Sequence, residues 1–104
     1  MAPQRRDASG PAAVDWAMAI ARPWHLYVLR CGDGTLYTGI ALDVQARLGE
    51  HREGRGARYT RGRGPLRLLH EEVVGSRSAA LKAEAALKRL PRARKLAWIA
   101  SRKA

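Results

Sequence analysis

The chain has 104 residues, enough for one small domain with one hydrophobic core. Hydrophobic residues make up 46% of the chain, and no apolar run approaches the ~18 residues of a transmembrane helix, so we expect no membrane partner. Twenty lysines and arginines against nine acidic residues give a net charge of +11. This excess predicts a polyanionic partner, most often nucleic acid. The alternatives are a solvated basic surface and an affinity for acidic membranes.

The single cysteine, Cys31, excludes an internal disulfide and a cysteine-based zinc site. Its place in an apolar segment predicts a buried structural thiol rather than a nucleophile. One free cysteine fits a reducing compartment, and we therefore expect the protein in the cytoplasm.

Residues 1–22 are rich in alanine, proline and arginine and show little periodicity, which favours a flexible N-terminal extension. A short helix could form at 12–20, and Met18 is an alternative start of the protein. The patterned domain covers residues 23–104. Residues 24–31 alternate in polarity and predict a strand, residues 32–34 (Gly-Asp-Gly) a turn, and residues 35–40 a second strand.

Asp43 is a good helix N-cap and Gly54 a good stop signal, so a helix is predicted over 43–53. A glycine- and arginine-rich loop follows at 55–64, and a third strand at 66–74. Ser76 predicts a second helix through about Leu90, and Pro91 the first turn of a third helix to about Arg102. The order ββαβαα indicates an α+β domain, with a small three-stranded antiparallel sheet flanked by helices.

Two tyrosines, Tyr27 and Tyr37, lie on the two predicted strands of the hairpin. Tyrosines in half-buried strands usually serve packing, so only their register makes the pair informative. A two-residue turn would point them to opposite faces of the sheet. A three-residue loop would pair residue 29 with 37 and place both on one face as diagonal neighbours. The Gly-Asp-Gly loop favours the second arrangement.

On the first helix, Arg47 and His51 fall on the apolar stripe defined by Val44 and Leu48. An arginine there either extends along the edge of the sheet or is held for a phosphate, which its planar fork suits. The histidine one turn further along favours the phosphate.

On the second helix, Glu84 lies within a stripe that includes Ala80, Leu81 and Leu87. A carboxylate in that position is costly unless it is paired or binds a metal. An ordinary pair with Lys88 at i,i+4 spacing is the alternative, and the helix alone slightly favours it. We expect Tyr27, Tyr37, Arg47, His51 and Glu84 to share one face of the sheet.

Over residues 24 to about 100, the chain resembles the GIY-YIG nuclease superfamily, and within it the small YhbQ-like group of bacterial proteins. The segment His25-Leu26-Tyr27 resembles the first family motif, of which it keeps the tyrosine. The segment Tyr37-Thr38-Gly39 resembles the second, of which it keeps the tyrosine and the glycine. The family arginine, its His/Tyr position and its metal-binding glutamate fall on Arg47, His51 and Glu84. Residues 57–62 (Ala-Arg-Tyr-Thr-Arg-Gly) also resemble the small group. The specific signal is that these five residues occur in the order of the family motifs and with matching separations along the chain.

The sequence departs from the family pattern at several positions. Gly-Ile of the first motif is replaced by His25-Leu26, and Ile40 stands where some excision-repair relatives have a lysine. Many members carry an asparagine after the glutamate; this chain has none, and Leu96 lies near that position. Because of these departures, we expect either a weak activity or a substrate that completes the site.

The resemblance implies a DNA endonuclease with one Mg²⁺ or Mn²⁺ on Glu84, an ion for which a single carboxylate suffices. Arg47 would bind the non-bridging phosphate oxygens, and a tyrosine assisted by His51 would deprotonate the attacking water. Either Tyr27 or Tyr37 could be this base, and we favour Tyr27. A structure-specific activity in repair or recombination is the candidate setting.

Two basic blocks, residues 52–67 and residues 88–103, would hold the backbone of double-stranded or branched DNA, and RNA is not excluded as a partner. Tyr59 could stack on a base or anchor its loop. A nucleic-acid-binding module without strong catalysis and a ribosome or RNA accessory protein are the rival functions. The residues expected to contact nucleic acid are Arg52, Arg55, Arg58, Tyr59, Arg61, Arg63, Lys88, Arg92, Arg94 and Lys95.

Overall fold

The computed structural model describes residues 22–103. Its core element is a three-stranded sheet in the order β2-β1-β3, formed by β1 (Trp24–Arg30), β2 (Leu36–Ala41) and β3 (Arg67–Gly75). Both strand pairs are antiparallel. The predicted N-terminal extension, with its short helix and the alternative start at Met18, lies outside the described residues except for Arg22.

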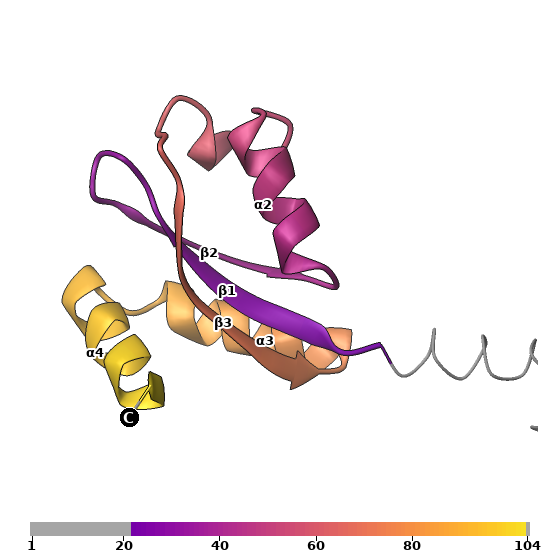
Figure 1. The fold of residues 1–104 in the computed structure, drawn as a ribbon. Coiled ribbons are helices and arrows are strands. Elements are labelled where there is room, and N and C mark those ends of the chain that lie inside the picture. Colours follow the sequence, from indigo (N-terminus) through magenta and orange to yellow (C-terminus); the bar gives the residue numbers. More distant parts are fainter. Residues whose placement is uncertain (1–21, 104) are drawn as a thin grey trace, which may run out of the picture.

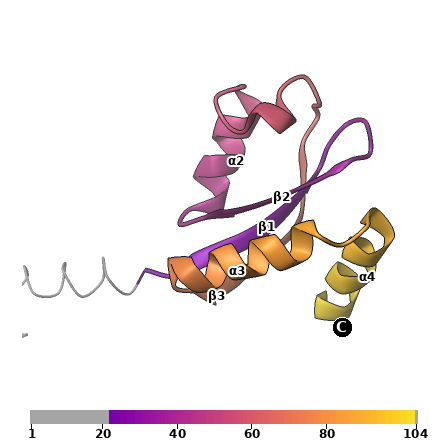
Figure 2. The ribbon, with the colours of Figure 1, turned by 180° about the vertical axis from the view of Figure 1, so that it is seen from behind.

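Helices lie on both faces of this sheet (Figures 1 and 2). Helix α2 (Val44–Arg52) and the short 3₁₀ helix η1 (Arg58–Thr60) lie on one side, and α3 (Arg77–Lys88) and α4 (Arg92–Lys103) lie on the other. The predicted α+β class and the order ββαβαα are therefore confirmed. The loop predicted at 55–64 contains η1, a turn that the sequence analysis did not anticipate.

The predicted helix signals have the expected contacts. The Asp43 carboxylate accepts a hydrogen bond from the Ala46 amide at 3.0 Å, and the Ser76 hydroxyl accepts one from the Ala79 amide at 3.1 Å. Gly54 follows α2 with a φ of +80°, a conformation that glycine adopts at no steric cost. The Asp43 and Ser76 side chains thus satisfy backbone amides that would otherwise be unpaired in the first turn of each helix.

The hairpin has the three-residue loop that brings the tyrosines together. The Cys31 amide donates to the Thr35 carbonyl at 2.8 Å, so residues 31 and 35 close the loop. Leu29 is then opposite Tyr37, and Tyr27 is opposite Gly39. The register predicted from Gly-Asp-Gly is confirmed, and both tyrosine side chains point to the same face.

The sheet separates two hydrophobic clusters. On the α2 face, Tyr27, Leu29 and Cys31 pack with Val44 and Leu48. Cys31 is buried, as predicted, and comes directly after β1. The cluster on the opposite face comes from the alternate residues of β1 together with α3 and α4, and its buried members are Leu26, Val28, Leu87 and Ile99.

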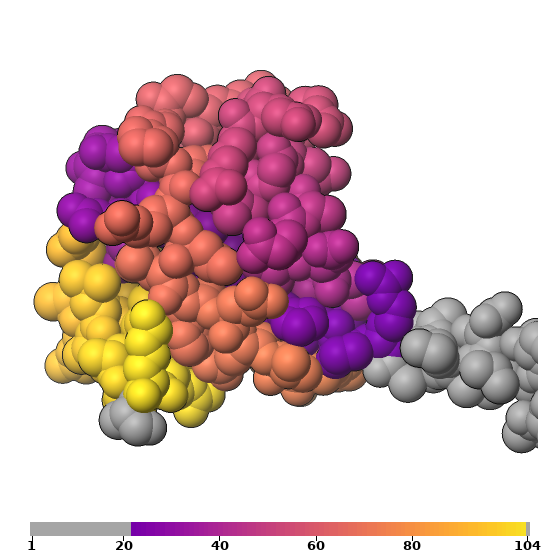
Figure 3. Space-filling view, viewed as in Figure 1, coloured from indigo at the N-terminus to yellow at the C-terminus, as the bar shows by residue number. Residues whose placement is uncertain are grey.

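The segment between α2 and β3 returns alongside α2, as the space-filling view shows (Figure 3). This return places η1 against the end of α2, where the buried Thr60 meets His51. Within residues 22–103, no helix has the length and apolar character needed to cross a membrane.

The cap at Asp43 gives a first prediction, on stability. Asp43→Ala leaves the Ala46 amide without its side-chain acceptor and should lower the free energy of unfolding by about 1 kcal/mol. Urea denaturation measures this change. Asp43→Asn is the matched control, because asparagine keeps the acceptor without the charge, and its loss should be clearly smaller. Equal losses for the two variants would contradict the capping role.

Candidate active site

The centre of the candidate site is a hydrogen bond between two buried side chains. Tyr27, on the central strand, is 1% exposed, and His51, in the last turn of α2, is 2% exposed. The Tyr27 hydroxyl and His51 Nε2 are 2.7 Å apart. This contact joins the sheet to α2, as expected from the helical periodicity that placed His51 on the same face as Val44 and Leu48.

The second nitrogen of His51 determines which way this bond runs. The Ala57 amide donates to His51 Nδ1 at 3.1 Å, and the Thr60 hydroxyl lies 3.1 Å from the same nitrogen. Because Nδ1 accepts a hydrogen bond from a backbone amide, we infer that the neutral ring carries its own proton on Nε2. His51 then donates to the Tyr27 oxygen. The donated bond stabilises negative charge on that oxygen.

Tyr37 lies beside this pair. Its ring centroid is 6.3 Å from that of Tyr27 and 5.2 Å from that of His51, in an edge-on contact. Tyr59 stacks on Tyr37 at 5.9 Å, and the Arg63 guanidinium lies over the Tyr59 ring at 4.3 Å. These contacts are those of a loop anchor, one of the two roles expected for Tyr59; its ring is nevertheless 41% exposed.

Arg47 lies one turn before His51 on α2, half-buried, and donates to the Glu50 carboxylate at 3.0 Å. Its charge is close enough to lower the pKa values of both Tyr27 and His51. The ion pair with Glu50 holds the side chain at the site and leaves several of the five guanidinium N–H groups for another acceptor.

Glu84 reaches the site from the opposite side, and the expectation that all five side chains share one face is wrong. Ala83 and Leu87 of α3 pack against the cluster on the far face of the sheet. Leu81, expected in the buried stripe, is 39% exposed. Glu84 flanks the packed residues, and its charge is near enough to raise the pKa of Tyr27.

The ordinary pair expected for Glu84 is present. Lys88 Nζ lies 3.4 Å from the Glu84 carboxylate and 5.9 Å from the centroid of the Tyr37 ring. The Glu84 side chain is 19% exposed and that of Lys88 is 50% exposed. Since Tyr37 lies on the edge strand β2, α3 brings this pair to the edge of the sheet next to the aromatic cluster.

Burial governs the ionisation of the central pair. Desolvation raises the pKa of the Tyr27 phenol well above its usual range, and Tyr37 raises it further, whereas Arg47 opposes the rise. Burial, followed by the Arg47 charge, lowers the pKa of His51. Both groups are therefore neutral near pH 7, and only further positive charge close to Tyr27 would favour its phenolate.

Two glycines allow this close packing. A Cβ atom on Gly39 would lie 2.5 Å from the Tyr27 hydroxyl oxygen and 2.6 Å from its Cζ. A Cβ atom on Gly56 would lie 2.2 Å from His51 Nδ1. The glycine of Tyr37-Thr38-Gly39 thus has a steric role, which is to let the Tyr27 ring lie flat across the neighbouring strand.

A divalent ion would have to use Glu84. Among residues 22–103, no group of three histidine, cysteine, aspartate or glutamate side chains is placed to hold a metal. A partly buried carboxylate still fits Mg²⁺ or Mn²⁺, because these hard ions prefer oxygen ligands and Mg²⁺ keeps several waters. The donor set does not fit a structural zinc site.

The residues expected to contact nucleic acid fall into two groups. Those of the first group come from the end of α2 and the segment that follows it, and two of them form ion pairs: Arg55 with Glu53 and Arg63 with Asp33. Those of α4 are further away on the opposite face; Arg92 donates to the Gly34 carbonyl at 3.0 Å. The remaining residues of this set are Arg52, Arg58, Tyr59 and Arg61 of the first group, Arg94 and Lys95 of the second, and Lys88, which lies on α3.

Four groups that hold the site were not predicted from the sequence. Thr60 and the Ala57 amide fix the His51 ring, Gly56 makes room for it, and Glu50 holds Arg47. Residues 57–62 drew attention only as a segment similar to the small group. The i,i+3 spacing of Arg47 and Glu50 was the one available signal for their pair.

Comparison with known proteins agrees with this geometry. A family model described as the GIY-YIG catalytic domain matches residues 23–97, so the chain belongs to the GIY-YIG family, which is of nuclease type. The UPF0213 protein XAC3202 of Xanthomonas axonopodis pv. citri is 50% identical over 82 residues, which cover 79% of this chain and 80% of that protein. A UPF0213 protein of Streptococcus sanguinis is 54% identical over 78 residues, covering 75% and 90%.

A solved structure supports the fold. The solution NMR structure of protein EF2693 from E. faecalis has a TM-score of 0.55 and 36% sequence identity, covering 79% of this chain and 88% of that one. The relatives confirm the resemblance to small GIY-YIG proteins, and their names assign no substrate.

The contact between Gly39 and Tyr27 gives a second prediction. Gly39→Ala forces the buried Tyr27 ring to move and should lower the free energy of unfolding by about 1–3 kcal/mol. Gly49→Ala is the control, because nothing lies within 4 Å of the added atom in the middle of α2; it should raise stability by about 0.5–1 kcal/mol. A Gly39→Ala protein as stable as wild type would contradict this packing.

The raised Tyr27 pKa gives a third prediction, on stability at alkaline pH. The folded state keeps the phenol proton above pH ~10, where the unfolded chain loses it. The stabilising contribution is therefore complete below that pH and falls by about 1.4 kcal/mol per pH unit above it. Urea denaturation between pH 9 and about 11.5 should show a steeper decline for wild type than for Tyr27→Phe. Tyr59→Phe, at a more exposed ring, should decline like wild type. Identical slopes for wild type and Tyr27→Phe would contradict the shift.

Proposed function

We propose that this protein is a divalent-metal-dependent endonuclease that hydrolyses DNA phosphodiester bonds. The observation that carries the proposal is the buried contact, at 2.7 Å, between His51 Nε2 and the hydroxyl oxygen of Tyr27, in which we infer that His51 is the donor. A histidine with a fixed tautomer, aimed at a phenol in a GIY-YIG domain, is a means of stabilising a phenolate. Packing alone does not require that arrangement.

Phosphodiester hydrolysis needs a deprotonated water, neutralisation of the phosphate charge and stabilisation of the leaving oxygen. Glu84 would hold a Mg²⁺ or Mn²⁺ ion, which supplies positive charge to the phosphate and to the leaving oxygen when bound. Arg47 supports the same charge from α2, because its guanidinium keeps donors free for the non-bridging oxygens while Glu50 fixes its position.

Tyr27 is the proposed general base. Its hydroxyl oxygen accepts a hydrogen bond from His51. The phenol proton of Tyr27 is therefore not used in that bond and can be lost without breaking it. Burial disfavours the phenolate until substrate and cation are in place, so activation of the base is coupled to assembly of the site. Tyr37, half-buried on the edge strand, would position the water or the phosphate.

A nucleic-acid-binding module with weak or no catalysis is the second candidate, and one contact favours it. Lys88 already neutralises the Glu84 carboxylate at 3.4 Å, as a cationic side chain does in an inactive site. The missing family asparagine points the same way. Duplex or branched DNA is the proposed partner in both cases, with repair or recombination as the proposed setting of the nuclease.

Replacement of the proposed metal ligand separates the two functions. Glu84→Gln should abolish cleavage of supercoiled and branched DNA in Mg²⁺ or Mn²⁺, while DNA affinity stays the same or rises slightly because a negative charge is lost. Nicking assays and fluorescence anisotropy measure the two properties.

Glu53→Gln is the matched control, since it removes an equal charge at an exposed position after α2, and it should cleave like wild type. Cleavage by Glu84→Gln at the wild-type rate would reject the metal-ligand role. A wild-type protein that binds DNA but does not cleave it would leave the binding module as the function.

A further inference from the structure

Three arginines line a hollow that belongs to no part of the proposed catalytic mechanism. Arg30 ends β1, Arg67 begins β3 and Arg52 ends α2; together with Cys31 and Gly32 they border a hollow of about 390 Å³. A second hollow of about 310 Å³ behind His51 shares Arg52, Pro65 and Leu66 with it. We call the two joined hollows the arginine furrow.

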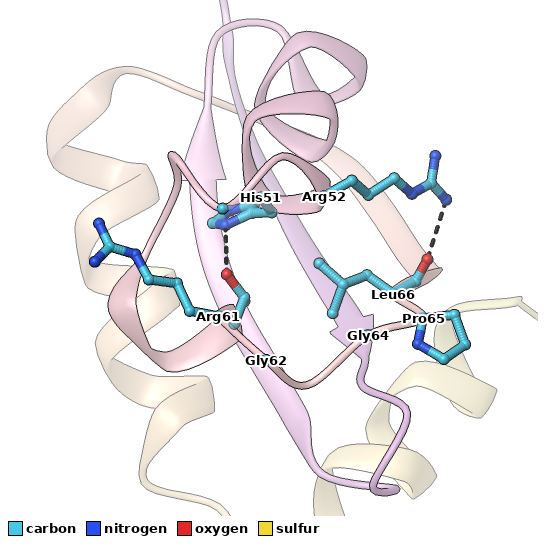
Figure 4. Close-up of a pocket in the computed structure, with 9 residues that line it drawn as sticks. His51, Arg52, Arg61, Gly62, Gly64, Pro65 and Leu66 are labelled. Atoms are coloured by element: carbon cyan, nitrogen blue, oxygen red, sulfur yellow. Dashed lines mark hydrogen bonds between the residues drawn. The ribbon is translucent and has the colours of Figure 1, made fainter.

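Arg52 is held where the two hollows meet. It donates to the Leu66 carbonyl at 3.0 Å, as Figure 4 shows, and this bond uses one of its five donors. Arg61 lines the hollow behind His51 from the other side. No aspartate or glutamate is among the residues that line either hollow.

The position of Arg30 and Arg67 is unfavourable for folding. The two residues are direct cross-strand partners in the antiparallel ladder between β1 and β3. Like charges directly opposite one another destabilise a sheet, and Arg52 adds a third positive charge to the same hollow. The fold alone gives no reason for this arrangement, whereas a bound anion would.

The acids of the domain do not relieve this repulsion. Of the nine acids, Asp7 and Asp15 precede the described residues, which leaves seven, and each of these has another contact. Asp43 caps α2, and the other six form ion pairs with Arg63, Arg47, Arg55, His25, Arg102 and Lys88. Within residues 22–103, none of the three arginines lies within 4 Å of a carboxylate oxygen.

We propose that the arginine furrow is a second phosphate-binding site, which takes the sugar-phosphate backbone of nucleic acid away from the scissile bond. The planar guanidinium fork suits phosphate oxygens, and three arginines border this one hollow, which fits an extended backbone better than a single small anion. Arg52 and Arg67 belong to the first basic block expected from the sequence, whereas Arg30 lies outside both blocks. The proposal rests on the proposed function only for its ligand, because binding in the furrow requires no cleavage.

The test is the affinity of Arg30→Gln/Arg67→Gln for a fluorescent DNA duplex, measured by anisotropy without divalent metal over a series of salt concentrations. Loss of two phosphate contacts should weaken binding of all sequences about equally, by about tenfold or more at low salt. The log–log salt slope should become shallower by about 2, or about 1 for each arginine.

Arg77→Gln/Lys82→Gln is the matched control. It removes the same charge on α3, beyond the far end of β3, and should change neither the affinity nor the slope by a comparable amount. Thermal denaturation is the second readout: the furrow variant should melt at the same temperature as wild type or higher, because the apposed charges are relieved. A merely structural pair would instead lower the melting temperature when removed.

The outcomes separate the two proposals. A furrow variant that binds like the control, or that melts clearly below wild type, overturns the furrow site even if wild type cleaves DNA. Weaker binding with a shallower slope and unchanged or higher stability supports the furrow even if wild type cleaves nothing. No DNA binding by wild type would reject both the furrow site and the nuclease.

Discussion

The structure depends on one buried contact, the hydrogen bond between Tyr27 and His51. It links the central strand to α2, and several neighbouring groups are fitted around it. Gly39 lets the Tyr27 ring lie across β2, and Gly56 lets the loop pass close to His51. Thr60 and the Ala57 amide hold the far side of the imidazole. A polar pair so deeply buried is tolerable only when its partners are fully specified.

The sheet also explains why the site is assembled at an edge. The tyrosines, Arg47 and His51 belong to the α2 face, whereas α3 packs on the opposite face. Glu84 nevertheless lies near the others because α3 packs against the edge strand β2, where Lys88 comes within 5.9 Å of the Tyr37 ring centroid. The edge of the sheet is therefore the place where a phosphate could meet both groups.

Local signals predicted most of the fold. Asp43, Ser76 and Gly54 act within one turn of the chain, so the helix boundaries followed from the residues themselves. The shared face of Tyr27 and Tyr37 followed from the loop length because side chains alternate along a strand. The face from which Glu84 approaches did not follow, since it depends on how α3 crosses the sheet. The alanine-rich helix has no sharp apolar stripe to indicate that crossing.

Charge connects the site with the rest of the surface. The buried Tyr27 phenol resists ionisation, and Arg47 reduces that resistance without removing it. In the proposed nuclease, this phenol would act as a base only when positive charge and substrate arrive together. The surplus of arginines then has a second consequence: the same charges that weaken the fold when unoccupied, such as Arg30 opposite Arg67, become favourable contacts when a polyanion is bound. Binding of a backbone should therefore stabilise the domain and bring the scissile phosphate to the site in one step.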